Sequence, residues 1–235
     1  MKLTESIKKA FRSLKSAALW LALKAAGTIC LNMSRGNEKL KSNDYILFLI
    51  WNLPAVKTCP WATEHCKAAC YALKAERAYP DVLPARKKNL EESKKSDFVD
   101  RAVYTILNAI RHDRKHRKIV VRIHESGDFY NREYAMKWLQ VAEILKHENV
   151  VFIAYTKSVT YFDGVKLPKN FRLRASIWDD TAADQLEIMK RNAWPVYTAV
   201  EKFQKGDKFT RCRCSDCATC GKCWAKYKDI RCEIH

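Results

Sequence analysis

Apolar runs of strand length, separated by segments of helix length, constrain the fold of this 235-residue chain more than any other feature. The runs at 118–129, 150–158 and 171–179 are rich in β-branched residues and have the length of buried strands. Between the first two, Asn131 can cap a helix whose apolar positions share one face. Strands that alternate with helices form βαβ units, so the sequence predicts an α/β protein with a parallel sheet.

The alternation continues on both sides of these runs. The apolar run 45–54, "YILFLIWNLP", predicts a strand that stops at its proline, and one or two helices follow between 84 and 113. A helix over about 181–192 leads to the apolar segment 194–200. Such a sheet is either open and doubly wound or a complete or partial barrel, and in both cases ligands bind at the carboxyl ends of the strands.

A loop with three cysteines directly follows the strand predicted at 45–54. Cys59, Cys66 and Cys70 have C-x6-C-x3-C spacing, without the C-x2-C pair that is common in zinc sites. Three thiolates can hold three irons of a four-iron cluster and leave the fourth iron open. The alternatives are a zinc site completed by His65 or a distant cysteine, and buried cysteines without a metal.

Polar motifs follow the other predicted strands. Ser126-Gly127-Asp128 ends the run 118–129, where a glycine permits close backbone approach and a carboxylate can accept from an ammonium group. An ordinary turn that caps the next helix is the alternative. Because parallel strands end at one edge, we expect these motifs to meet the cysteine loop at one rim. Further candidates for ligand contacts there are Thr156, Lys157, Ser158, Ser176 and Asp179.

The chain after residue 206 contains six cysteines and too few apolar residues for a core of its own. Cys214, Cys217, Cys220 and Cys223 are separated by two residues each, a spacing close to that of bacterial ferredoxins and also compatible with a four-cysteine zinc ribbon. We predict that these four bind a second iron–sulfur cluster or zinc. Cys212 and Cys232 are alternate ligands, and Cys30 is structural.

The formal net charge of +18 favours a polyanionic partner such as DNA or RNA, although a solubilising basic surface would give the same total. Candidate contacts are the tracts 86–88, 111–118 and 222–228. Residues 3–26 predict an amphipathic helix that packs on the main domain and contains no transmembrane segment. Without an export signal we expect a reducing cytoplasm, where clustered cysteines bind metals more often than they form disulfides.

The order of these parts over about residues 45–200 resembles the radical S-adenosylmethionine (AdoMet) enzymes, whose usual cysteine spacing is C-x3-C-x2-C. The resemblance implies that Cys59, Cys66 and Cys70 bind a [4Fe-4S] cluster whose open iron binds AdoMet. It implies AdoMet contacts at Ser126, Gly127, Asp128, Thr156, Ser158, Ser176 and Asp179, with Tyr71 near the adenine. One-electron cleavage of AdoMet would then give a 5′-deoxyadenosyl radical, with an electron-donor protein as a partner.

Room for only five or six strands makes the implied barrel partial. We expect an N-terminal helix at 1–28, a partial (β/α) barrel at 29–205 and a Cys-rich metal-binding extension at 206–235. The hypothesis is an enzyme that modifies a nucleic acid or nucleotide. The competing hypotheses are a non-enzymatic zinc or iron–sulfur protein that binds nucleic acid, and a redox carrier with two clusters.

A second resemblance spans nearly the whole chain. The segments "GNEKL", "NLPAVKTCPWATEHCKAACYA", "SGDF", "AYTKS" and "CATCGKCW" are similar to a phage-encoded family of the gene-product-eighty-eight type. This resemblance implies a phage-infected or prophage-carrying bacterial host and no particular reaction.

Overall fold

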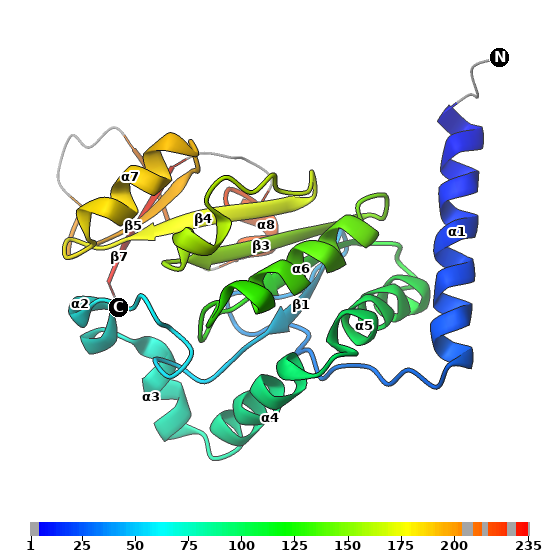
Figure 1. Ribbon diagram of the computed structural model, residues 1–235, viewed down its shortest axis with the longest axis horizontal. Helices are drawn as coiled ribbons and strands as arrows, with labels where there is room; N and C mark the ends of the chain where they lie inside the picture. The colour runs from blue at the N-terminus through cyan, green and yellow to red at the C-terminus, as the bar shows by residue number, and fades with distance from the viewer. Residues whose placement is uncertain (1–4, 204–208, 213–215, 225–228, 235) are drawn as a thin grey trace.

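The computed structural model describes residues 5–203, 209–212, 216–224 and 229–234. Within them, one sheet contains seven parallel strands in the order β1-β2-β3-β4-β5-β7-β6 (Figure 1). The sheet curls into a half-barrel, which confirms the α/β class and agrees with the predicted partial barrel. The strands are β1 (Ile46–Trp51), β2 (Lys118–Ile123), β3 (Val150–Thr156), β4 (Phe171–Ile177), β5 (Val196–Val200), β6 (Thr210–Arg211) and β7 (Ile230–Glu233).

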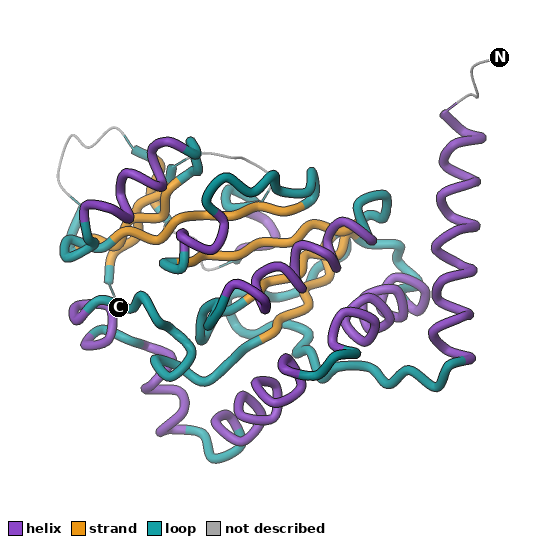
Figure 2. The backbone as a smooth tube through the Cα atoms, in the orientation of Figure 1, coloured by secondary structure: helices purple, strands orange, loops and turns teal. Residues whose placement is uncertain are grey.

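Helices connect the first five strands, as the alternating pattern predicted (Figure 2). Strands β1 to β5 lie inside the five apolar segments of the sequence, and Asn131 caps α6 by accepting a hydrogen bond from the Tyr134 amide at 2.8 Å. The helices are α1 (Glu5–Ala25), α2 (Glu64–Ala68), α3 (Tyr71–Ala78), α4 (Val82–Lys94), α5 (Phe98–His112), α6 (Arg132–Ile144), the 3-10 helix η1 (Val159–Phe162), α7 (Ala183–Arg191) and α8 (Cys217–Cys220).

The main core lies between the sheet and the helices on its outer face. Every residue of β1 is buried, as expected for a parallel strand that is covered on both faces. Trp51, Phe98 and Trp138 pack together there, with ring centroids 5.4 to 6.4 Å apart. Large aromatic rings in edge contact contribute packing energy beyond their buried area, so this trio fixes α5 and α6 on the sheet.

The inner face of the sheet has a smaller core of its own. Side chains of β1, β2 and β3, including Phe48 and Ile153, pack there with Ala218 of α8 and with Trp224. Figure 1 shows α8 behind the sheet, on the side opposite α5 and α6. The Cys-rich segment therefore covers the concave face of the half-barrel and also supplies β6 and β7 to its sheet.

The N-terminal helix α1 packs against α5, as the sequence predicted. Leu19, Trp20 and Leu23 contact the main core, and Trp20 stacks on Tyr104 with ring centroids 6.4 Å apart. Gly27 follows the helix with a φ of +71°, a conformation that glycine adopts at helix ends. Over the described residues, we find no helix that combines the length and the apolar character needed to cross a membrane.

A buried histidine makes the stability of the fold depend on pH. His124 is 2% exposed, its Nε2 hydrogen-bonds the Tyr134 hydroxyl at 2.9 Å, and its Nδ1 has no hydrogen-bond partner. Burial, assisted by the charge of Arg122, lowers the pKa of His124 to about 3. In the unfolded chain the His124 imidazole is protonated below about pH 6.5, whereas in the folded chain it stays neutral down to about pH 3. The free energy of unfolding therefore falls as the pH falls below about 6.5.

We expect acidification from pH 7 to pH 5 to lower the free energy of unfolding by about 2 kcal/mol through this group. Urea unfolding at both pH values measures the change. The control is His124→Asn, because asparagine tolerates the positive φ of 65° at this position and cannot titrate. An equal pH dependence in the wild type and in this variant would contradict the assignment.

Candidate functional site

The loops that follow β1, β2, β3 and β4 meet at one rim of the half-barrel. These strands are neighbours and all parallel, so their carboxyl ends lie side by side. The Leu53 amide donates to the Ser126 carbonyl at 2.9 Å, and Thr156 Oγ1 donates to Asp128 Oδ1 at 2.6 Å. Lys157 Nζ donates to Ser176 Oγ at 3.1 Å. The predicted convergence of these segments with the cysteine loop is thus present.

Two short helices position the cysteine loop. Cys59 follows β1 in a turn, Cys66 lies in α2, and Cys70 precedes the first residue of α3. The Thr63 hydroxyl caps α2 by accepting from the Cys66 amide at 3.3 Å. Burial, assisted by the Asp128 carboxylate and the other two thiols, raises the pKa of the Cys59 thiol to about 12. The three cysteines therefore share one electrostatic environment on the rim.

The turn after β2 is fastened to the base of the cysteine loop. Ser126 Oγ donates to the Leu53 carbonyl at 2.8 Å, and the Asn52 side chain accepts from the Ser126 amide at 3.1 Å. Gly127 has a φ of +82°, and a Cβ atom there would lie 2.6 Å from Thr58 Oγ1 and 2.7 Å from Leu53 Cβ. Glycine is thus required at position 127 both by the backbone conformation and by close packing.

Gly127→Ala should lower the free energy of unfolding by about 3 kcal/mol, because it adds a steric clash to an unfavourable φ. The matched control is Gly164→Ala, which has a similar φ of +68° and nothing within 4 Å of the added methyl group. For the control we expect a loss of about 1 kcal/mol. Chemical denaturation of both variants measures the difference, and equal losses would show that the contact with the cysteine loop is unimportant.

Asp128 joins the ends of β2 and β3 from a buried position. Its carboxylate accepts hydrogen bonds from the Phe129 amide at 2.7 Å, the Lys157 amide at 2.9 Å and the Thr156 hydroxyl. Ser158 Oγ donates to the Phe129 carbonyl at 2.9 Å. Burial raises the pKa of Asp128, while the three hydrogen bonds act in the opposite direction. Ser126, Asp128, Thr156 and Ser158 therefore use their polar groups within the protein, and their predicted contacts with AdoMet stay predictions.

Tyr71 lies next to the last cysteine of the loop. Its hydroxyl donates to the Glu125 carbonyl at 2.5 Å, which links α3 to the turn after β2. The residue as a whole is 56% exposed, so its ring is accessible from outside. A planar ligand could pack on this ring, and the adenine that the resemblance to radical AdoMet enzymes implied there stays a prediction.

A cavity of about 200 Å³ opens beside the cysteine loop. Lys157 enters it with its ammonium group 5.4 Å from the centroid of the Trp178 ring. Gln185 is 4% exposed, and neither Nε2 nor Oε1 of its side chain has a hydrogen-bond partner. The lining consists of Pro60, Trp61, Ala62, Thr63, Lys157, Ser176, Asp180, Thr181, Ala182, Gln185 and Met189.

Sequence reasoning identified Lys157 and Ser176 but missed Gln185. The available signal was a glutamine at the spacing of the buried residues Ile188 and Met189 on α7. A buried amide without partners is costly, so this side chain is suited to a ligand or water that both donates and accepts. A larger hollow of about 560 Å³ lies between α7 and the start of β5, and none of the cysteines lines it.

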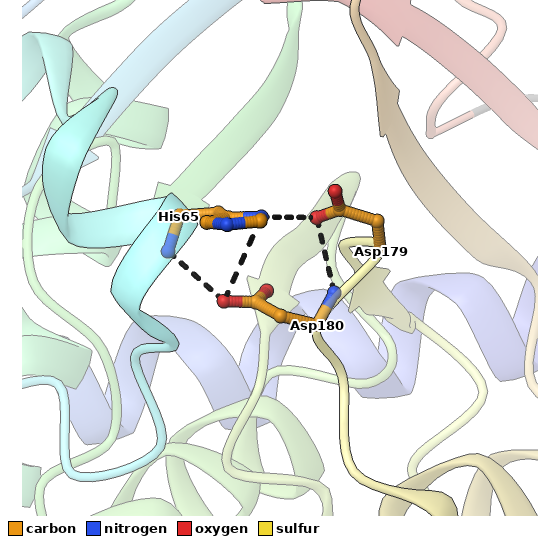
Figure 3. Close-up of side chains that lie close together, drawn as sticks. All are labelled: His65, Asp179 and Asp180. Atoms are coloured by element: carbon orange, nitrogen blue, oxygen red, sulfur yellow. Dashed lines mark hydrogen bonds and ion pairs between the residues drawn. The ribbon is translucent and has the colours of Figure 1, made fainter.

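An exposed cluster closes the rim on the side of α2 (Figure 3). His65 Nδ1 lies 2.8 Å from Asp179 Oδ1, and the His65 amide donates to Asp180 Oδ2 at 2.9 Å. The hydrogen bond to Asp179 raises the pKa of His65. Within the described part of the chain, only these three residues bring three potential metal-ligand atoms within 4.8 Å of one another. The pairing ties the cysteine loop to the loop after β4.

The Cys-rich segment is held on the inner face of the sheet by a buried arginine. Arg174 is 0% exposed and donates from Nε to the Cys223 carbonyl at 2.9 Å and from Nη2 to the Lys222 carbonyl at 3.1 Å. Burial raises the pKa of Cys217 to about 11 and also raises that of Cys223. Of the four ligands predicted here, Cys217, Cys220 and Cys223 are described, whereas Cys214 lies outside the described residues.

The basic tracts are partly engaged within the protein. Arg86 is buried and pairs with Glu76 at 2.8 Å, and Arg117 pairs with Asp113 at 2.8 Å. Lys115 pairs with Asp44 on the surface. Residues 225–228 of the third tract lie outside the described residues. Arg86 therefore has a structural role, and contact of these tracts with a polyanion stays a prediction.

Comparison with known proteins identifies the family. A family model described as Gene product 88 matches residues 31–226. The chain belongs to the gene product 88 family. This family member is 32% identical over 109 residues to the Gene 88 protein of Mycobacterium phage D29 and, equally, to that of Mycobacterium phage L5. Each alignment covers 44% of this chain and 44% of the relative. No solved structure matches.

These relatives support the phage setting that the sequence predicted for this gene product 88 family member. The alignments span less than half of either phage protein, and the names of these proteins state no activity. The resemblance to radical AdoMet enzymes therefore depends on the order and placement of residues in this chain.

Proposed function

We propose that this protein is an iron–sulfur enzyme of the radical AdoMet type that acts on a nucleic acid or nucleotide. The observation that supports the proposal most is the placement of Cys59, Cys66 and Cys70 on one loop at the carboxyl ends of the strands. A cavity with a cation and an unpartnered amide, from Lys157 and Gln185, lies beside that loop. A three-thiol set next to a polar cavity is what an open-coordination cluster site requires.

The donor set suits a polynuclear cluster better than a single zinc ion. Tetrahedral zinc, with Zn–S bonds of about 2.3 Å, holds its sulfurs about 3.8 Å apart. No three sulfurs of the described cysteines lie within 4.8 Å of one another. Cys59, Cys66 and Cys70 would hold a [4Fe-4S] cluster, which, when bound, would supply the electron for cleavage of a C–S bond in AdoMet.

Residues of the chain have defined tasks on this proposal. Lys157 has spare ammonium hydrogens beyond its bond to Ser176, so it can bind a carboxylate or phosphate in the cavity. Gln185 can pair with a ligand edge that both donates and accepts. The network around Asp128 keeps the turns after β2 and β3 fixed, which holds the cysteine loop in place. An electron-donor protein is the implied partner.

The net charge of +18 supports a polyanionic substrate. We propose DNA, RNA or a free nucleotide, since each contains the phosphate that Lys157 and the exposed basic residues could bind. Lys157→Met should weaken nucleotide binding about tenfold, measured by calorimetry at fixed ionic strength. Lys190→Met removes an exposed cation of α7 outside the cavity and should leave binding unchanged. Equal losses in both variants would assign the effect to overall charge.

The deciding experiment is anaerobic purification followed by reduction and addition of AdoMet. We expect a brown protein that contains iron and sulfide, a paramagnetic resonance spectrum that changes with AdoMet, and 5′-deoxyadenosine in the products. Assays with DNA, RNA and nucleotides identify the substrate by which one increases deoxyadenosine formation. A colourless protein with bound zinc and no deoxyadenosine would overturn the proposal.

One observation favours a second candidate, a metal-stabilised protein that binds nucleic acid without catalysis. Ser126, Asp128, Thr156 and Ser158 have hydrogen-bond partners within the protein, as expected if the rim is purely structural. Nucleic-acid binding without AdoMet cleavage would support this candidate.

A further inference from the structure

The C-terminal strands bring two cysteines together that are 20 positions apart in the sequence. On β6 and β7, Arg211 is paired with Arg231, so the next residues, Cys212 and Cys232, are neighbours. The Cys212 amide continues the ladder by donating to the Arg231 carbonyl at 2.7 Å. The two thiols also hydrogen-bond each other. Neither residue belongs to the run of cysteines with regular spacing.

Strand register places both thiols on the inner face of the sheet. Laterally paired residues of a parallel sheet share a face, and residues two apart on a strand share it too. Tyr197 pairs with Ile230, which shares its face with Cys232. Tyr197 also pairs with Ser176 of β4. Arg174 lies two residues before Ser176 and therefore shares its face, and it pairs with Tyr155 of β3. Tyr155 packs with the inner core, which identifies this face as the concave one.

Two further cysteines reach the same place from the segment that covers the inner face. Cys217 and Cys223 pack on the inner core together with Tyr155, whereas Cys220 is not among the residues packed there. The hydroxyl of Tyr155 lies close enough to Cys223 to act on the pKa of that thiol, and the hydroxyl of Tyr197 does the same at Cys232. The two tyrosine rings are themselves in edge contact, with centroids 4.9 Å apart. The four cysteines therefore all lie on the inner face of the sheet, where this pair of tyrosines also lies.

We propose that the C-terminal metal centre is held by Cys212, Cys217, Cys223 and Cys232 inside the half-barrel. This set replaces Cys214 and Cys220 of the regular run with two cysteines from the sheet. The ligand chemistry is four thiolates, which suits an iron–sulfur cluster or zinc. The inference is independent of AdoMet chemistry at the first cysteine loop.

The surroundings are suited to a concentration of negative charge. The hydroxyls of Tyr155 and Tyr197 act to lower the pKa values of Cys223 and Cys232, and they would donate hydrogen bonds to these sulfurs as metal ligands, as groups around such ligands commonly do. Arg122 lies over the Tyr155 ring, with its guanidinium carbon 3.7 Å from the centroid, and Arg174 holds the backbone at Cys223. Two cations beside four thiolates lower the cost of burying an anionic centre.

Such a centre would join the last two strands to the segment that covers the concave face. Strand β6 has only two residues, so its pairing with β7 contributes little by itself. A metal bound by Cys212 after β6, by Cys232 of β7 and by Cys217 and Cys223 would fix both strands and the segment over the inner face. The reason is that binding energy at a structural metal site is folding energy. We expect the loss of the metal to loosen this end of the sheet.

Thiol footprinting of the full chain tests the ligand set directly. The protein, purified without oxygen, is treated with iodoacetamide before and after removal of metal by a chelator and oxidant, and the modified cysteines are found by peptide mass spectrometry. We expect Cys212, Cys217, Cys223 and Cys232 to become reactive only after metal removal. Cys220 and the exposed Cys30 should react in both states. Protection of Cys214 and Cys220 with reactive Cys212 and Cys232 would overturn the proposal.

Substitutions give a second readout that distinguishes the two sets. Cys232→Ser should lower the bound C-terminal metal at least tenfold, whereas Cys220→Ser should retain it. Both substitutions are made in a chain that also carries Cys59→Ala, Cys66→Ala and Cys70→Ala, so that the first loop contributes no metal. Analysis of iron, sulfide and zinc then identifies the metal that is bound. Full metal content in the Cys232→Ser variant, or equal loss in both, would contradict the assignment. AdoMet cleavage plays no part in these measurements.

Discussion

Cys66→Ala is expected to reduce 5′-deoxyadenosine formation to the level of an enzyme-free blank. Cys66 lies in α2 between the other two cysteines of its loop, and two thiolates cannot hold a cluster that needs three. The proposed C-terminal metal centre should remain, because Cys217 and Cys223 lie on the inner face of the sheet and do not belong to this loop. Product analysis by mass spectrometry and metal analysis of the same preparation measure both effects.

The control for this substitution is Cys30→Ala, which removes an exposed thiol far along the chain from the loop. It should retain full AdoMet cleavage and metal content. Undiminished cleavage in the Cys66→Ala variant would show that the first loop does not bind the cluster. Loss of the C-terminal metal as well would show that the substitution unfolds the chain, which circular dichroism would reveal.

Asp128→Ala is expected to lower the free energy of unfolding by about 4 kcal/mol. The substitution leaves the Phe129 amide, the Lys157 amide and the Thr156 hydroxyl without their acceptor in a buried place. Each unsatisfied buried donor costs about 1 to 3 kcal/mol, and small relaxations recover a part of the sum. Denaturant unfolding of the anaerobic protein measures the change.

Asp81→Ala is the control, because Asp81 is exposed before α4 and its side chain makes no capping hydrogen bond. We expect this variant to unfold close to the wild type. Asp128→Asn retains an acceptor for two of the three donors and should be the milder change. If Asp128→Ala were as stable as the wild type yet lost AdoMet binding, Asp128 would be a ligand contact and not a structural link.

The sequence was sufficient to predict strands β1 to β5, because all five lie within apolar runs. The runs of β1 to β3 reflect burial on both faces, whereas β5 is half-buried along its length. Strands β6 and β7 were not predicted, because their segments contain no long apolar run. Thr210–Arg211 and Ile230–Glu233 are short and polar, and only the register of the sheet makes them strands. The extension predicted at 206–235 therefore contributes to the main sheet.

The candidate site likewise contains residues that could be predicted from the sequence and residues that could not. A position at a strand end follows from chain order, so Asp128, Lys157 and Ser176 could be placed on one rim in advance. What each side chain contacts depends on distances between segments far apart in the sequence. Gln185 was therefore not predicted as a site residue, Cys212 and Cys232 were predicted only as alternate or redundant ligands, and the internal partners of Asp128 were not foreseen.

The order of strands also sets the order in which the chain can be completed. Strand β6 is synthesised before β7 but touches the sheet only through it, since β7 lies between β5 and β6. A nascent chain that has reached residue 211 has nowhere to dock this strand until residues 230–233 leave the ribosome. Assembly of this edge of the sheet therefore waits for β7, and ribosome-stalled chains that end before β7 should display an unfinished sheet edge at β5.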